Sequence, residues 1–192
     1  RRNRISGSLE IYFKKSVDLY GDAPYDYTTW GSNGTIVRNV ASIKGNGVDL
    51  SIQSLNIDKE FKWTTNFLLN YNYNETVAYY TENAANYYAP TTGEMITPVI
   101  GKPLYAIAAY KWGGLNEAGD PQGYVNGELS TDYATIFKEI SNKGIESDNI
   151  IYFGSSNPTY LGALINRINW KGFEVSFNIS YKLGYYFRKP SL

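Results

Sequence analysis

The feature that most constrains this chain is the alternation of apolar and polar residues over unusually long runs. It is clearest at residues 5–13, 61–73 and 173–183, where apolar side chains occupy almost every second position. A period of two places successive side chains on opposite faces of a β-strand. Strands of soluble domains are about five or six residues long, whereas a strand that crosses an outer membrane needs about 9 to 11. The three runs therefore predict two-faced strands of the length that a membrane β-barrel uses.

A tight turn separates the last two runs. Lys171-Gly172 lies between residues 161–170 and 173–183, and a glycine in a two-residue connection favours the turns of β-hairpins. We therefore predict an antiparallel hairpin at this point.

A second turn is expected at residues 56–59, because Asn and Asp tolerate turn conformations. It would connect a strand at residues 35–53 to the strand at residues 61–73. The alternation of the earlier strand slips near Ser54 and Leu55, which predicts a bulge or the end of the strand there.

Longer connections hold the rest of the chain. Residues 15–35 combine turn-forming and aromatic residues and predict an aromatic-rich loop. Residues 75–160 contain one short alternating run, at 104–112. If both short turns lie on the periplasmic side, residues 75–160 begin and end on the external side, so they contain either zero or two membrane crossings. We expect none, because only one alternating run is found. Short turns at one end and long loops at the other are typical of outer-membrane barrels.

One helix is predicted within the long connection, at about residues 132–141. Thr131 or Asp132 could cap its start, and residues 142–144 could stop it. The helical spacing comes from Tyr133, Ile136, Phe137 and Ile140.

Composition excludes several classes of function. The 18 basic and 18 acidic residues cancel, so no uniform field attracts nucleic acid. The chain has no Cys and no His, which removes disulfides, zinc-thiolate sites and Ser-His-Asp triads. Its isolated carboxylates do not establish the spaced pair that a glycosidase needs. We therefore predict no enzymatic activity, no catalytic residue, no cofactor and no metal.

Alternation alone cannot distinguish a membrane barrel from a soluble β-sandwich, since both have one apolar and one polar face. The aromatic residues add to the argument, because rings with an apolar body and a polar edge favour membrane interfaces. Trp63, Trp170 and Tyr181 near the strand ends are predicted girdle residues. A barrel needs at least about eight strands, and five or six are found here, so we expect other sequence to complete it.

Several short blocks, in a fixed order, resemble one family. Residues 12–19 are similar to its "Y-x-K-x-T-x-D-L" block, residues 39–50 to its "N-x-G-x-x-x-N-x-G-x-E-L" block, and residues 61–67 to its "W-x-T-x-x-N" strand. Further blocks follow at residues 4–8, 101–104, 114–121, 154–158 and 170–176. Together they resemble the SusC/RagA family of TonB-linked (TonB-dependent) outer-membrane proteins. The chain departs from the pattern at Ala41, where Gly is usual, and lacks an acidic, glycine-rich stretch before residue 154.

The resemblance implies a fold and a location. It implies that residues 1–192 are a segment of the C-terminal part of a TonB-dependent receptor, without its plug domain and remaining strands. The fold class would be all-β, part of a large antiparallel transmembrane β-barrel with long external loops and one short loop helix. The location would be the outer membrane of a Bacteroidetes-type bacterium, which the chain crosses several times in contact with lipid.

The resemblance also implies a function, the import of a large nutrient, a glycan or an oligopeptide. A SusD-like surface lipoprotein would cap the barrel as a lid, and TonB would act through the absent N-terminal part. Two alternatives stay open. One is a SusC-like barrel with a structural or assembly role in an outer-membrane complex, and the other is a soluble aromatic-rich β-sandwich binding module.

Aromatic residues in the loops are the candidate ligand contacts, since rings stack on sugar faces and on peptide groups. Trp30, Tyr87, Tyr88 and Tyr124 are predicted to contact the ligand or the lid. The alternative is that these rings fold the loops on themselves.

Overall fold

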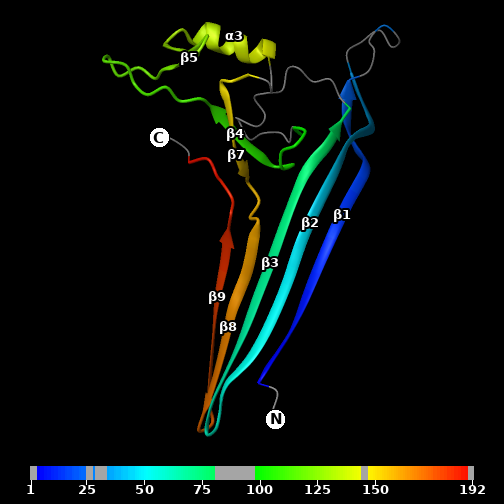
Figure 1. The fold of residues 1–192 in the computed structure, drawn as a ribbon, viewed down its shortest axis with the longest axis vertical. Coiled ribbons are helices and arrows are strands. Elements are labelled where there is room, and N and C mark those ends of the chain that lie inside the picture. The colour runs from blue at the N-terminus through cyan, green and yellow to red at the C-terminus, as the bar shows by residue number, and fades with distance from the viewer. Residues whose placement is uncertain (1–3, 25–27, 29–33, 81–97, 144–146, 190–192) are drawn as a thin grey trace. The chain divides into compact units, whose positions relative to one another are not determined.

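The computed structural model describes residues 4–24, 28, 34–80, 98–143 and 147–189, and it is mostly β-structure (Figure 1). The predicted all-β class with long antiparallel strands and one short helix is confirmed. In chain order the elements are β1 (Ile5–Pro24), β2 (Thr35–Asp58), β3 (Phe61–Tyr79), β4 (Ala106–Tyr110), β5 (Gly123–Val125), β6 (Glu128–Ser130), α3 (Tyr133–Lys143), β7 (Ile150–Ser155), β8 (Tyr160–Trp170) and β9 (Phe173–Leu183).

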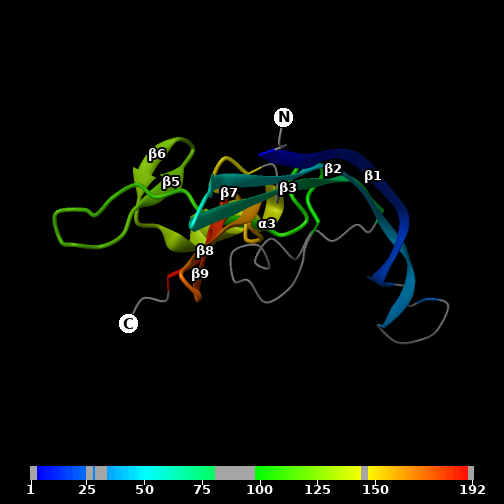
Figure 2. The ribbon, with the colours of Figure 1, turned by 90° about the horizontal axis from the view of Figure 1, so that it is seen from below.

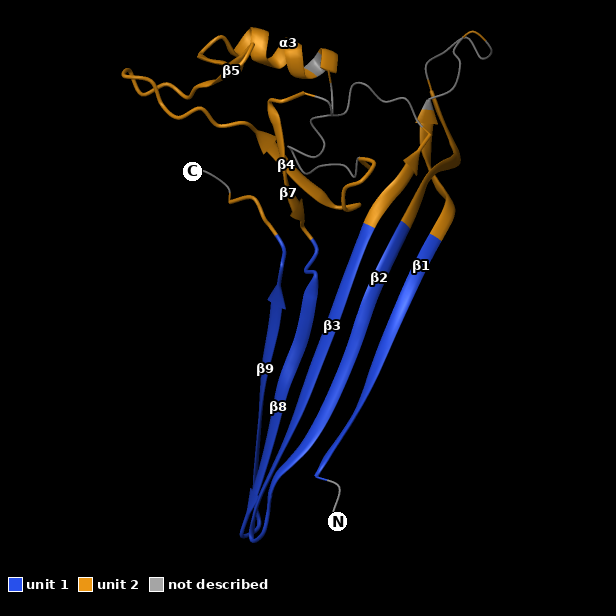
Figure 3. Ribbon diagram, viewed as in Figure 1, with its two compact units in different colours: residues 1–15, 44–74, 157–185 blue, residues 16–43, 75–156, 186–192 orange. Residues whose placement is uncertain are grey.

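The chain divides into two compact units, which Figure 3 colours separately. Unit 1 comprises Arg1–Lys15, Lys44–Asn74 and Asn157–Tyr185, and unit 2 comprises Ser16–Ile43, Glu75–Ser156 and Tyr186–Leu192. Residues of β1, β2 and β3 belong to both units. β8 and β9 belong to unit 1, and the short strands and α3 belong to unit 2.

A five-stranded sheet runs in the order β1-β2-β3-β8-β9, and Figure 2 shows β1, β2 and β3 side by side. β8 pairs antiparallel with both β3 and β9. Trp170 pairs with Phe173 across the final turn, where Lys171 has φ 47° and Gly172 has φ 88°. Two positive φ angles in a two-residue turn are the mark of a type I′ hairpin. The predicted hairpin is therefore confirmed.

The register gives the sheet of unit 1 two unlike faces, because successive side chains point to opposite sides. We call one the apolar face; on β3, β8 and β9 it carries Phe61, Trp63, Phe67, Leu69, Leu164, Ile168, Trp170, Phe173, Val175, Phe177 and Ile179. We call the other the polar face; it carries Lys62, Thr64, Asn66, Asn70, Arg167, Asn169, Glu174, Ser176, Asn178, Ser180 and Lys182. On β9, Phe173 (75%), Val175 (59%) and Ile179 (56%) of the apolar face are more than half exposed.

The apolar face contains one chain of polar side chains. The Ser54 hydroxyl donates to Asn56 Oδ1 (2.8 Å), and Asn56 Nδ2 donates to Thr65 Oγ1 (2.7 Å). Asn166 Oδ1 then accepts from Thr65 Oγ1 (2.7 Å) and from the Trp63 indole (3.0 Å). The expectation that the strand ends near Ser54 is wrong, because β2 continues to Asp58 and its polar residues find these partners. The turn follows at Lys59 and Glu60, later than predicted.

β1 is longer than predicted, because it continues to Pro24 instead of giving way to a loop after residue 14. In unit 2 its last residues contribute Ala23 to a small buried cluster with Val40 and Ala41, against which Leu19 and Tyr79 pack. These buried contacts explain why the segment stays extended despite its turn-forming residues. The central part of the predicted loop lies outside the described residues.

Unit 2 also contains two short two-stranded sheets, of which only β5-β6 is a hairpin. β4 pairs antiparallel with β7, and β5 with β6, which lie side by side in Figure 2. β4 lies within the alternating run at 104–112, and β5, β6 and β7 were not predicted. The connection between β5 and β6 is Asn126-Gly127, with φ of 50° and 86°, again a type I′ turn.

The predicted helix is confirmed as α3. Of its two candidate caps, Asp132 is the one that acts, because its carboxylate accepts from the Thr135 amide (3.1 Å) and from the Thr135 hydroxyl (2.6 Å). These hydrogen bonds lower the pKa of Asp132 below its ordinary value. Of the apolar residues whose spacing predicted the helix, Ile140 is fully buried, while Tyr133 and Phe137 remain about half exposed. Within the described ranges, no helix is long and apolar enough to cross a bilayer.

Candidate functional site

A groove of about 440 Å³ crosses the polar face of unit 1. Asp49 lies in it and accepts a hydrogen bond from Asn70 Nδ2. Glu10 also lines the groove, so two carboxylates that the sequence left isolated meet in one place. The lining comprises Ser8, Glu10, Asp49, Leu50, Ser51, Leu68, Leu69, Asn70, Leu161, Gly162 and Ala163. Hydroxyl, amide and carboxylate groups thus share the groove with apolar side chains, among them Leu68 and Leu161.

Charges of both signs continue along the polar face. Arg167 on β8 and Glu174 on β9 approach to 3.4 Å between Nε and Oε1, with both side chains more than half exposed. An exposed pair of this kind contributes little to stability.

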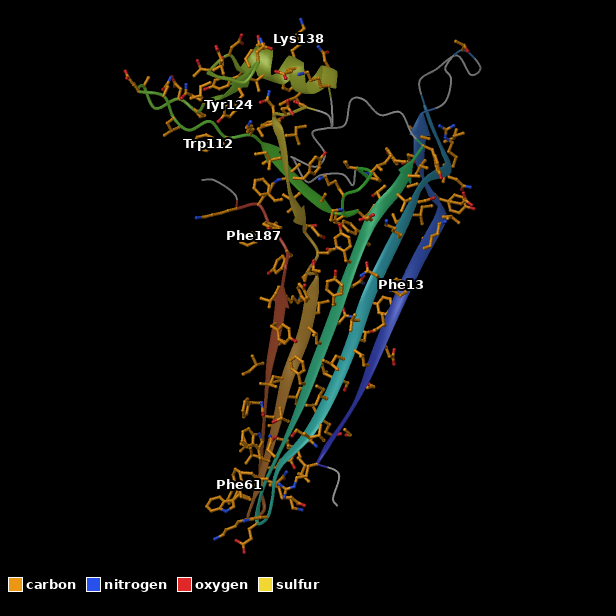
Figure 4. The ribbon with its side chains drawn as sticks, in the orientation of Figure 1. Phe13, Phe61, Trp112, Tyr124, Lys138 and Phe187 are labelled. Atoms are coloured by element: carbon orange, nitrogen blue, oxygen red, sulfur yellow. The ribbon has the colours of Figure 1, made fainter. Side chains whose placement is uncertain are left out.

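Tyr124 is the one predicted ligand contact within the described residues. It lies on β5, where Figure 4 labels it, and the Lys111 ammonium sits 4.4 Å from its ring centroid. Its carbonyl oxygen accepts from Asn149 Nδ2 (2.9 Å). Both contacts are made with other residues of unit 2, and the predicted contact of Tyr124 with a ligand or lid stays a prediction. Trp30, Tyr87 and Tyr88 lie outside the described residues.

The three predicted girdle residues all lie on the sheet of unit 1. Trp63 donates to Asn166, as described above, and Trp170 is half exposed at the final turn. Tyr181 on β9 pairs with Gly162 on β8, and its side chain extends over this glycine. The Tyr181 hydroxyl then donates to the Leu68 carbonyl oxygen on β3 (3.0 Å). Tyr181 therefore connects β9 to β3 across β8, a role that the sequence did not suggest.

The potential metal ligands of the described residues are scattered. No group of three or more potential ligand side chains gathers there in a way that could hold a metal ion. The arrangement of unit 1 is that of a wall with one wettable and one apolar surface.

Comparisons with known proteins agree with this geometry. No protein-family model and no curated protein sequence matches the chain. Solved structures do match. The RagAB peptide transporter matches with a TM-score of 0.70 and 20% sequence identity, and the match covers 95% of this chain and 19% of that chain. The RagAB peptide importer matches in its "open-open" state with TM-score 0.71 and in its "closed-closed" state with TM-score 0.64, both at 20% identity and 95% of this chain.

These structures are transporters, and the likeness at this level of identity concerns the fold. The chain spans about one fifth of the chains that it matches. Its five-stranded sheet, short turns and long loop region are therefore similar to one part of the RagAB peptide transporter.

Proposed function

We propose that this chain forms part of the barrel wall and external loops of a TonB-dependent importer in a bacterial outer membrane. The observation that carries the proposal is the two-faced sheet of unit 1 combined with its structural likeness to RagAB. The exposed apolar side chains of β9 support contact with lipid, because a soluble protein rarely leaves a continuous apolar surface open to water. The polar face would then line the passage.

We further propose that the imported nutrient is an oligopeptide. The matched structures carry peptide in their names, and the groove on the polar face offers carboxylate, amide and hydroxyl groups to a peptide backbone. A glycan would use the same groups, so the choice has to be made by experiment. A SusD-like surface lipoprotein would act as the lid, and TonB would drive transport through parts of the protein outside this chain.

The test is made on the whole protein in its native membrane. Mass spectrometry of the detergent-extracted complex should recover peptides beyond both ends of this chain, together with a SusD-like lipoprotein. Uptake of fluorescently labelled oligopeptides by cells should then depend on the intact gene and on TonB.

Each other outcome is informative. Uptake of a labelled glycan in place of a peptide would retain the importer and replace its cargo. A stable outer-membrane complex without any TonB-dependent uptake would favour the structural or assembly role. Recovery of a soluble 192-residue protein without detergent would refute the membrane proposal.

A further inference from the structure

Two lysines lie on the apolar face of unit 1, at the end away from the short turns, and the function proposed above does not use them. The turns at residues 59–60 and 171–172 mark one end of this sheet, where Figure 4 labels Phe61, and Phe13 lies toward the other end. In an outer-membrane barrel the short turns are periplasmic. The end of the sheet near Phe13 is therefore the external end in the proposed orientation.

A single register pairs β1 with β2 in unit 1. The Leu55 amide donates to the Arg4 carbonyl oxygen (2.7 Å), and a Cβ at Gly47 would touch the Tyr12 ring, so each pair lies side by side. The two pairs are equally spaced on both strands, so the alignment is antiparallel and contains no bulge between them. Glu10 lines the groove of the polar face. Even-numbered residues of β1 and odd-numbered residues of β2 therefore face that side.

The adjacent lysines of β1 consequently lie on opposite faces. The Lys14 ammonium is 4.4 Å from the ring centroid of Tyr12, on the polar face. Lys15 is exposed and follows Phe13 on the apolar face, and no ion pair of its side chain is found among the described residues. Continued to the last residue of β1 in unit 1, the register places Lys15 opposite Lys44, which is also exposed.

This arrangement favours an anion between the two ammonium groups, because like charges opposite each other on neighbouring strands destabilise a sheet. Glu75 on β3 supplies one negative charge, so Lys15, Lys44 and Glu75 together retain a positive charge. Exposed apolar side chains continue directly from Lys15 along β1, with Phe13 84% and Ile11 64% exposed. The site thus combines a cationic end with an apolar surface, the two properties of a lipid headgroup and its acyl chains.

We propose that Lys15 and Lys44 bind a phosphate group of a lipid in the external leaflet of the outer membrane. The apolar stem of a lysine lies along hydrocarbon while its ammonium reaches the headgroups. The acyl chains would pack on Phe13 and Ile11, a contact that free phosphate cannot make. The inference rests on the membrane orientation in the proposed function.

The test uses the full-length protein purified in a neutral detergent and lipid A, a phosphorylated glycolipid, as the probe. Native mass spectrometry at increasing lipid concentration gives the dissociation constant for lipid A with its phosphates and for lipid A from which they have been removed. We expect the phosphorylated form to bind more tightly. Lys15→Gln and Lys44→Gln should each weaken its binding about fivefold, and the double variant about 25-fold, the effect expected for basic side chains at an anionic surface.

Two further variants locate the effect. Lys14→Gln removes the same charge from the adjacent residue on the polar face, and we expect it to leave lipid binding unchanged. Lys15→Arg keeps the cation, so it should bind phosphorylated lipid A as the parent does. This variant separates a loss of charge from a disturbance of the strand.

The inference is overturned by equal binding of the two forms of lipid A, by equal losses in Lys14→Gln and Lys15→Gln, or by no loss in the double variant. Displacement of lipid A by inorganic phosphate would assign the pair to a free anion and also overturn the lipid site. If the parent protein still imports labelled peptides, the importer stands and only this site fails. A protein that is soluble without detergent would refute the proposed function and the lipid site together.

Discussion

Gly162 shows how closely the side chains of unit 1 are fitted. A Cβ atom at this position would overlap the Leu68 carbonyl oxygen and the Tyr181 ring, which lies across the glycine. A glycine beneath a cross-strand aromatic ring is a device that pins the register of a sheet. The absence of a side chain at residue 162 is thus a requirement of its neighbours.

The consequence is a prediction for Gly162→Ala. The added methyl group must displace a ring and a backbone carbonyl, so we expect the free energy of unfolding to fall by about 1 to 3 kcal/mol. Tyr181→Phe is the matched control, because it keeps the ring and loses only the hydrogen bond to Leu68, about 1 kcal/mol. Urea unfolding of the full protein in lipid vesicles measures both. A larger loss in Tyr181→Phe than in Gly162→Ala would contradict the argument.

Residues whose role is local were the ones that the sequence could predict. The Lys171-Gly172 turn is one, because its φ requirement is a property of two adjacent residues. Asn56 was misread as part of a turn, because Thr65 supplies its hydrogen-bond partner from β3, a different strand. The groove of unit 1 was missed for the same reason, since its lining comes from β1, β2, β3 and β8, which meet only in the folded chain.

At the scale of the elements, the final hairpin allows the effect of backbone conformation on stability to be measured without an effect of side-chain contacts. A Cβ at Gly172 would meet nothing within 4 Å, so Gly172→Ala tests only the positive φ of 88°. We expect it to cost about 1 to 2 kcal/mol, the penalty of a left-handed residue with a Cβ. Lys171→Asn should instead stabilise slightly, because Asn adopts this conformation more readily. Thermal unfolding, followed by the change in gel mobility between folded and unfolded protein, would measure both effects. Equal melting temperatures for the two variants would refute the assignment of a type I′ turn.

The cap of α3 provides a pH-dependent prediction at the same scale. The folded pKa of Asp132 lies below its unfolded value of 3.8. Its contribution to helix stability is therefore complete above pH 3.8 and is lost as the pH falls through the folded pKa. Hydrogen exchange of the first turn of α3 should accelerate below that pH in the parent protein.

Two substitutions test whether Asp132 is the group responsible. In Asp132→Ala the first turn should exchange fast at every pH, because the cap is absent. Thr131→Ala should behave like the parent, since no side-chain hydrogen bond of Thr131 is found among the described residues. A pH response that persists in Asp132→Ala would assign it to another group.

The whole molecule is tested by placing charge on either face of the sheet. Ile179→Lys puts an ammonium on the apolar face near the middle of β9, where lipid contact costs about 2 to 4 kcal/mol. Val175→Lys, nearer the turn, should cost less, and Ser180→Lys, on the polar face, should cost almost nothing. The amount of folded protein in the outer-membrane fraction should follow that order. Equal losses for Ile179→Lys and Ser180→Lys would exclude a membrane orientation of this sheet.

The polar chain from Ser54 to Trp63 has a further meaning for how such a sheet assembles. A slip of one residue between β3 and β8 would turn Asn166 to the opposite side from Thr65 and Trp63. The Trp63 indole N–H and the Thr65 hydroxyl would then lose their shared acceptor, and a polar group that faces hydrocarbon without a partner costs several kcal/mol. If the sheet inserts into a bilayer as proposed, the native alignment of β3 and β8 is the one that keeps these groups paired, so we expect the polar chain to select that alignment during insertion.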